Sequence, residues 1–215
     1  MIPYGKQHID ESDIEAVVST LKSDWLTQGP AVPRFEKALT DYTHADNAVA
    51  VNSATSALHL ACLALDIKKY DTVWTSPNSF VASANCAIYC GASVDFVDID
   101  PSTGNMCLQK LEEKLFAAKK QNCLPKALIP VHFAGQSCDM ETISRLAKQY
   151  NFYVIEDASH AVGASYRDKP VGCCAYSDIC VFSFHPVKIV TTIEGGAALT
   201  NSEAFAEKMR LARSH

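Results

Sequence analysis

The sequence predicts an α/β fold in which helices cover both faces of a mixed, mostly parallel sheet, giving three layers in the order αβα. From residue 47 onward, short apolar segments typical of buried strands alternate with longer segments that have helical spacing. Such alternation is typical of parallel strands joined by covering helices. The last two predicted strands, 179–182 and 197–200, have no helix between them. This break in the rhythm predicts that the sheet is mixed.

The chain begins with a predicted helical arm. Apolar residues recur every three or four positions in 10–21, whose first turn is acidic, so we expect a helix there. A turn-rich segment at 27–30 separates it from a second predicted helix at 31–42. The other predicted elements are strands at 48–51, 73–75, 93–97, 127–131 and 153–155, and helices at 56–65, 81–89, 108–119, 140–150 and 202–213.

The composition is that of one globular domain. The chain has 215 residues, of which 48% are apolar and 20% charged, and this is enough to bury a sizeable core. A net charge of -5 gives no reason to expect nucleic acid or an anionic membrane as a partner. No apolar run approaches the roughly 20 residues that span a bilayer, and residues 1–4 lack a signal-peptide pattern. We therefore expect one domain, 1–215, with an N-terminal helical arm.

Cysteine usage and the last helix give two further expectations. The nine cysteines are scattered and contain no Cys-x-x-Cys pair, which predicts reduced thiols in the cytoplasm rather than a disulfide framework or a metal site. The predicted helix at 202–213 runs to Ser214 and His215 without a glycine or proline stop signal. This suggests that the chain is part of a longer protein.

Small polar residues follow the first predicted strand. Asn52-Ser53-Ala54-Thr55-Ser56 lies between that strand and the next helix. Because the first N–H groups of a helix have no partner within it, this segment could cradle a phosphate. The alternative is an ordinary helix N-cap by Ser53 or Thr55, and taken alone the segment favours the N-cap.

Two further strand ends have residues that could meet a flat, cationic ring. Phe80, after the second strand, could stack on such a ring or belong to the core. Glu156 and Asp157 end a strand, where a buried carboxylate needs a cationic partner. A pyridinium nitrogen is one such partner, and a magnesium ion or a helix N-cap are the alternatives. His160 could bind near this carboxylate or be a core histidine.

A lysine follows the strand at 179–182. Lys188 lies in an apolar, hydroxyl-rich loop, where a lysine can have a lowered pKa and attack an aldehyde. Gly195 and Gly196 would let the backbone pass close to a ligand or turn tightly. A surface lysine beside a hairpin turn is the alternative. The four segments together provide what an enzyme dependent on pyridoxal phosphate (PLP) needs.

The chain resembles fold-type-I aminotransferases of the DegT class, which aminate nucleotide-linked keto sugars. The resemblance covers essentially all 215 residues. Within the family, the opening Ile2-Pro3-Tyr4-Gly5 and the sequence His185-Pro186-Val187-Lys188 are most similar to the enzymes that make the 4-amino sugar of the pseudaminic acid pathway. The matching segments are Trp25–Pro30, Asn52–Leu58, Glu156–Gly163 and Ser183–Lys188 with Glu194–Gly196.

This resemblance implies a role for each matching residue. Lys188 would form the Schiff base with PLP and act as the catalytic residue, and Asp157 would pair with the pyridine nitrogen. His160 would lie near the ring hydroxyl, and Phe80 would stack on the ring. The phosphate would be held by Ala54, Thr55 and Ser183, and the sugar nucleotide would contact Tyr4, Trp25, Leu26, Thr27, His132 and His185.

The resemblance also implies a reaction. An amino group would pass from glutamate, through PLP, to a UDP-linked 4-keto-6-deoxy sugar, in a protein that forms homodimers. Some relatives have a histidine at the lysine position and catalyse dehydration, so Lys188 favours transamination. Two departures are Ala54, where many relatives have glycine, and the absence after His215 of the family's small C-terminal domain. The alternatives are a PLP lyase, a non-catalytic scaffold or inactive fragment, and a nucleotide-binding module without PLP.

Overall fold

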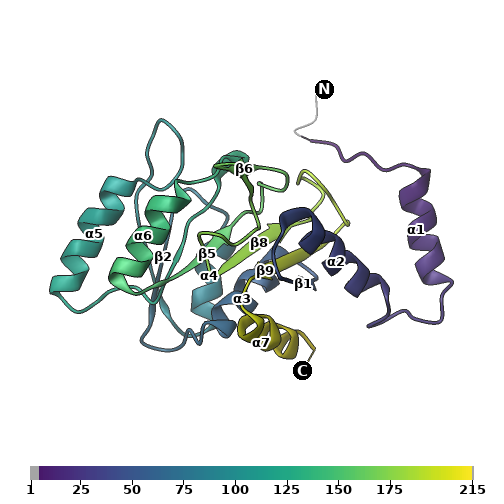
Figure 1. The fold of residues 1–215 in the computed structure, drawn as a ribbon, viewed down its shortest axis with the longest axis horizontal. Helices are drawn as coiled ribbons and strands as arrows, with labels where there is room; N and C mark the ends of the chain where they lie inside the picture. Colours follow the sequence, from purple (N-terminus) through teal and green to yellow (C-terminus); the bar gives the residue numbers. More distant parts are fainter. Residues whose placement is uncertain (1–4, 215) are drawn as a thin grey trace.

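The computed structural model describes residues 5–214. Its main sheet has seven strands in the order β1-β9-β8-β5-β4-β2-β3, and only β9 runs against its neighbours (Figure 1). The prediction of a mixed, mostly parallel sheet is therefore confirmed. The seven strands are β1 (Asn47–Val51), β2 (Thr72–Thr75), β3 (Ser93–Phe96), β4 (Ala127–Ile129), β5 (Tyr153–Asp157), β8 (Ile179–Ser183) and β9 (Gly196–Thr200).

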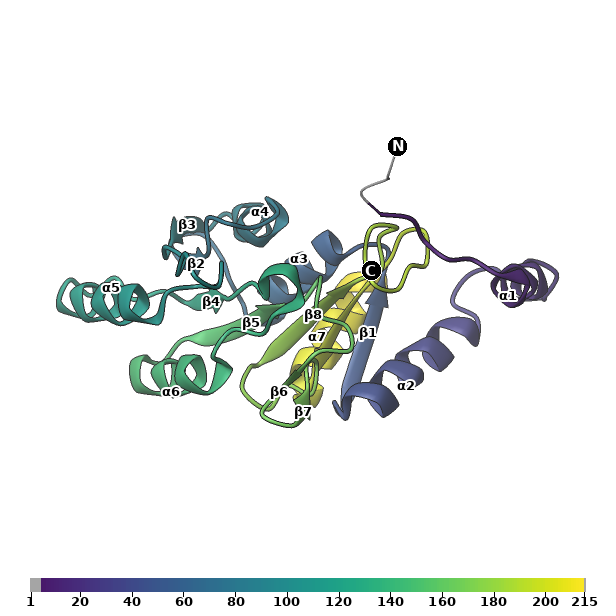
Figure 2. The ribbon, with the colours of Figure 1, turned by 90° about the horizontal axis from the view of Figure 1, so that it is seen from above.

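Helices cover both faces of the sheet, and Figure 2 shows the layers from above. Successive strand residues point to opposite faces, so Ile155 packs with α3, α4 and α7 while Val154 packs with α5 and α6. Helix α2 covers the rest of the face on which α5 and α6 lie, and it packs there beside β8 and β9. Within residues 5–214, no helix is both long and apolar enough to cross a membrane. The helices are α1 (Glu11–Leu21), α2 (Ala31–Thr43), α3 (Ala54–Ala64), α4 (Ala82–Tyr89), α5 (Leu108–Lys120), α6 (Met140–Tyr150) and α7 (Glu203–Ser214).

The elements depart from their predicted bounds at three informative places. Helix α3 begins two residues before the predicted start, at Ala54. Strand β4 ends at Ile129 because Pro130 has no N–H to donate, although Val131 still pairs with Asp157. A short hairpin of β6 (Ser165–Tyr166) and β7 (Lys169–Pro170) was not predicted, because two-residue strands have too few residues to show an alternating pattern.

The N-terminal arm lies beside the body of the molecule (Figure 1). Its helix α1 begins with a capping box, in which the Asp10 side chain accepts from the Asp13 backbone and the Asp13 side chain accepts from the Asp10 backbone. The apolar residues Ile14, Val17 and Leu21 are exposed rather than packed on the sheet. Local capping and spacing therefore specify this helix without a core contact from the chain itself.

Candidate functional site

A cavity of about 540 Å³ lies at the carboxyl ends of β5 and β8. Ligands of open α/β sheets bind at this end, where loops from several strands converge. The structure brings all seven predicted cofactor residues together in its lining: Ala54, Thr55, Phe80, Asp157, His160, Ser183 and Lys188.

The predicted substrate residues fall into three groups. His132 and His185 line the cavity, although the His132 ring is buried behind the surface. Trp25 and Leu26, with Thr27, belong to the exposed connection between α1 and α2 and are not in the lining, so the geometry of a single chain gives their predicted role no support. Tyr4 lies outside the described residues.

The N-terminus of α3 lies at the cavity, with Ser53, Ala54 and Thr55 in its lining. Ser53 is the N-cap, and its hydroxyl accepts a hydrogen bond from the Ser56 N–H at 3.2 Å. Ala54 and Thr55 are the first two helical residues, so their N–H groups have no carbonyl within the helix to bond. The two sequence interpretations are therefore compatible, since Ser53 caps the helix while Ala54 and Thr55 offer N–H groups to an anion.

Because Gly196 has no side chain, it can lie against the turn between β1 and α3. It begins β9, and a Cβ atom there would collide with the backbone of Ser53 and Ala54. The sequence suggested close approach to a ligand or a tight turn, whereas the close neighbour is the backbone of the α3 N-terminus. The packing of β9 against this turn therefore depends on glycine.

We expect Gly196→Ala to weaken PLP binding by about tenfold or more, because the α3 N-terminus must shift to admit a methyl group. Fluorescence titration of the folded protein with PLP would measure the change. Pyridoxal, which lacks the phosphate, is the control ligand and should lose much less affinity. An equal loss for both ligands would contradict a specific effect on the phosphate position.

Asp157 is a buried carboxylate with three hydrogen-bond donors on the cavity wall. The Ser83 hydroxyl donates to one oxygen at 2.6 Å, and the Ser159 hydroxyl and amide donate to the other at 2.6 and 3.2 Å. Ser83 lies on α4, and its contribution was missed because a serine in a helix gives no sequence signal of a contact 74 residues away.

Lys188 and His160 meet across the cavity, with 2.6 Å between Nζ and Nε2. Partial burial lowers the pKa of Lys188, and the charge of Asp157 opposes that shift. Burial and the charge of Lys188 lower the pKa of His160, again against the effect of Asp157. A neutral His160 can therefore accept a hydrogen bond from the Lys188 amine.

These shifts predict how the capture of an aldehyde at Lys188 depends on pH. Below its pKa the lysine is an ammonium without a lone pair, and above it the amine can attack. Because burial lowers the pKa, the rate of PLP capture should reach half its maximum below the ordinary lysine value of about 10.4. Stopped-flow absorbance at several pH values would measure this midpoint, with a blocked free lysine as the control. A midpoint equal to that of the free amine would contradict the prediction.

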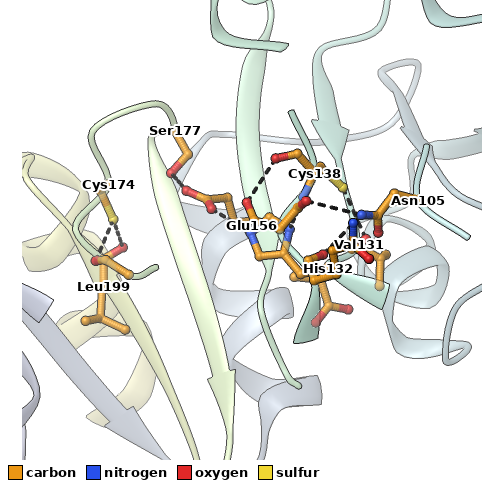
Figure 3. A network of polar contacts seen from close by, with 12 residues as sticks. Asn105, Val131, His132, Cys138, Glu156, Cys174, Ser177 and Leu199 are labelled. Carbon is orange, nitrogen blue, oxygen red and sulfur yellow. Dashed lines mark hydrogen bonds and ion pairs between the residues drawn. The ribbon is translucent and has the colours of Figure 1, made fainter. Parts of the chain in front are cut away.

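Behind the cavity wall lies a buried polar network (Figure 3). His132 Nε2 and a Glu156 oxygen are 2.8 Å apart, and Ser177 donates to the other Glu156 oxygen. The Cys138 amide donates to Nδ1 of His132 at 3.3 Å, so the ring proton is on Nε2 and points to Glu156. The resemblance implied that His132 contacts the sugar nucleotide, and the structure adds that both of its ring nitrogens have partners within the protein.

Comparison with known proteins agrees with this arrangement. Residues 7–215 match the model of the DegT/DnrJ/EryC1/StrS aminotransferase family. The chain is 47% identical over its full length to the UDP-4-amino-4,6-dideoxy-N-acetyl-beta-L-altrosamine transaminase of Campylobacter jejuni. It superimposes with a TM-score of 0.89 and 37% identity on PseC of Helicobacter pylori, an aminotransferase involved in pseudaminic acid biosynthesis, covering 99% of this chain and 56% of PseC.

A further solved structure bears on the cofactor. NtdA of Bacillus subtilis, solved with the cofactor pyridoxamine phosphate (PMP), matches with a TM-score of 0.81 and 31% identity, over 94% of this chain and 45% of NtdA. The chain spans about half the length of the curated relatives it matches, and 55% of the Campylobacter jejuni protein. Since the family match covers nearly every residue, the chain belongs to the DegT/DnrJ/EryC1/StrS aminotransferase family.

Proposed function

We propose that the protein containing this chain transfers an amino group from glutamate, through PLP, to a UDP-linked 4-keto-6-deoxy sugar. The observation that carries the proposal is the meeting of Lys188, Asp157 and the α3 N-terminus at one cavity. These groups match the three polar ends of PLP, which are its aldehyde, ring nitrogen and phosphate. The transaminase from Campylobacter jejuni, named for a UDP-linked amino sugar, supports the choice of sugar.

The residues of the cavity would divide the work between binding and proton transfer. PLP, when bound, withdraws electrons from the carbon that bears the amino group. Asp157 would hold the ring nitrogen in its charged form, and the N–H groups of Ala54 and Thr55 would hold the phosphate. Lys188 would take a proton from the α-carbon of the amino donor as a base and return it to the cofactor carbon as an acid. His160 would keep the lysine amine oriented through the 2.6 Å contact.

A direct assay of the complete protein tests this proposal. Purified protein loaded with PLP would be incubated with glutamate and a UDP-linked 4-keto-6-deoxy sugar, and 2-oxoglutarate and amino sugar would be measured. Equal amounts of the two products would support transamination. Release of ammonia or pyruvate without an amino sugar would instead support a PLP lyase, and binding of UDP without capture of PLP would support a nucleotide-binding module.

We also propose that the complete protein is a homodimer. The N-terminal arm supports this, because Leu21, Trp25 and Leu26 are each more than 60% exposed and apolar clusters of this kind are typical of protein interfaces. A second copy covering the arm would also bring Trp25 and Leu26 to a neighbouring surface, where a role in substrate binding could arise.

A further inference from the structure

Glu156 and Asp157 are neighbours on β5 with opposite orientations. Asp157 faces α4, where Ser83 donates to it, while Glu156 faces the other side of the sheet, where His132 and Ser177 bind it. Both carboxylates are less than 6% exposed. Because adjacent strand residues share one peptide unit, any shift of the Glu156 backbone also shifts Asp157.

His132 binds this pair of residues twice. Its backbone N–H donates to the Asp157 carbonyl at 3.0 Å, and its ring binds the Glu156 carboxylate at 2.8 Å. The Asp157 N–H in turn donates to the Pro130 carbonyl at 2.9 Å. The segment beyond β4, where Pro130 interrupts the regular ladder, is thereby fixed to the end of β5 by backbone and side chain together.

The same network extends to the part of the cavity wall that Phe133 forms. The thiol of Cys138 donates to the Val131 carbonyl at 3.3 Å, and the Cys138 amide donates to the His132 ring. Asn105, which is buried, accepts from the Phe133 N–H at 2.9 Å. Since Phe133 lines the cavity, the network sets the position of this part of the wall relative to Asp157.

We propose that His132 and Glu156 are positioning residues, which fix Asp157 and the Phe133 wall where the ring of the cofactor binds; this inference rests on the proposed function. Neither side chain reaches the cavity with a polar group, since the ring nitrogens and both carboxylate oxygens are bound within the protein. Stability alone would not require this arrangement, because well-packed apolar residues stabilise a core at least as well as a buried polar pair. Directional hydrogen bonds instead restrict where Asp157 can lie.

The decisive comparison is Glu156→Ala against Glu156→Gln in the complete protein. Alanine removes the acceptor for both His132 and Ser177, so we expect the affinity for PLP and for PMP to fall by about tenfold or more. Glutamine keeps an oxygen for His132, and the Ser177 hydroxyl can rotate to accept from its amide, so binding should stay within about threefold of the unchanged protein. Titration by fluorescence, per mole of folded protein, would measure both constants.

Asp178→Ala is the matched control. Asp178 is a half-buried carboxylate directly before β8, and it accepts from the Val154 N–H at 2.7 Å near the other end of β5. Its removal should lower the midpoint of thermal unfolding while leaving the affinity for PLP unchanged. If Glu156→Ala does not fold, the double variant His132→Phe/Glu156→Leu replaces the pair with apolar volume and should fold with weakened PLP binding.

The outcomes distinguish failure of the positioning role from failure of the proposed function. Weak PLP binding in Glu156→Ala or the double variant, with near-normal binding in Glu156→Gln and Asp178→Ala, would support the positioning role. Unchanged PLP affinity in Glu156→Ala or in the folded double variant would overturn it, as would an equal loss in Asp178→Ala. Failure of the unchanged protein to bind PLP would instead reject the proposed function.

Discussion

Lys188→Ala is expected to lower kcat for glutamate-dependent amination by at least about 10⁴-fold. The variant loses both the nucleophile that holds the cofactor and the group that moves the proton, and proton transfer alone contributes about 10²–10⁴-fold. No second lysine lines the cavity among residues 5–214, so none there can replace Lys188. Single-turnover kinetics with glutamate would measure the loss.

A chemical label provides the control for this variant. Borohydride reduction of the protein with PLP should attach the label to the peptide containing Lys188, and the label should be lost in Lys188→Ala. Lys169→Ala, which removes an exposed lysine of β7, should retain both label and turnover. Full turnover in Lys188→Ala would show that the chemistry occurs elsewhere.

Asp157→Asn is expected to lower kcat by about 10²–10³-fold, the scale typical of removing one charged or hydrogen-bonding partner from a reacting group. A neutral amide cannot stabilise a protonated ring nitrogen. It also turns an NH₂ group toward Ser83 or Ser159, both of which donate to Asp157. Steady-state kinetics, with the absorbance spectrum of the bound cofactor, would report the change in ring charge.

Ser83→Ala is the matched control for the aspartate. It removes one donor to Asp157 but leaves the carboxylate and the two donors from Ser159. We therefore expect less than about a tenfold fall in kcat, in line with the loss of one hydrogen bond. If Asp157→Asn and Ser83→Ala had the same small effect, the charge of Asp157 would not matter for the reaction.

The sequence predicted the sheet and the convergence of the cavity residues for one reason. Parallel strands end at the same edge of the sheet, so residues at or just after their ends, such as Thr55, Asp157 and Lys188, are all placed at that edge. The types of these residues, a lysine, a buried carboxylate and a helix N-terminus, then indicated a cofactor with an aldehyde, a ring nitrogen and a phosphate. Apolar spacing was sufficient to predict the helices that cover the sheet, because each packs against it along one face.

Other features depended on strand order and on contacts that the pattern of residue types does not reveal. The pairing of His132 with Glu156 arises because β4 lies beside β5, and the sequence alone does not establish that neighbour. The resemblance implied a substrate contact for His132, and it gave no sign of the pairing with Glu156. The need for glycine at 196 likewise follows from the approach of β9 to Ser53, which are far apart in the chain.

The antiparallel direction of β9 determines where the loop that contains Lys188 begins and ends. Because β9 runs against β8, the loop 184–195 leaves the sheet and re-enters it at the same edge, so both its ends are anchored beside the cavity. The Phe184 N–H bonds to the Gly195 carbonyl at 2.9 Å, which closes the base of the loop. In the proposed reaction, a lysine on such a short tether would keep a high effective concentration at the reacting carbon. The antiparallel strand would thus keep Lys188 beside the cavity for the proposed proton transfer.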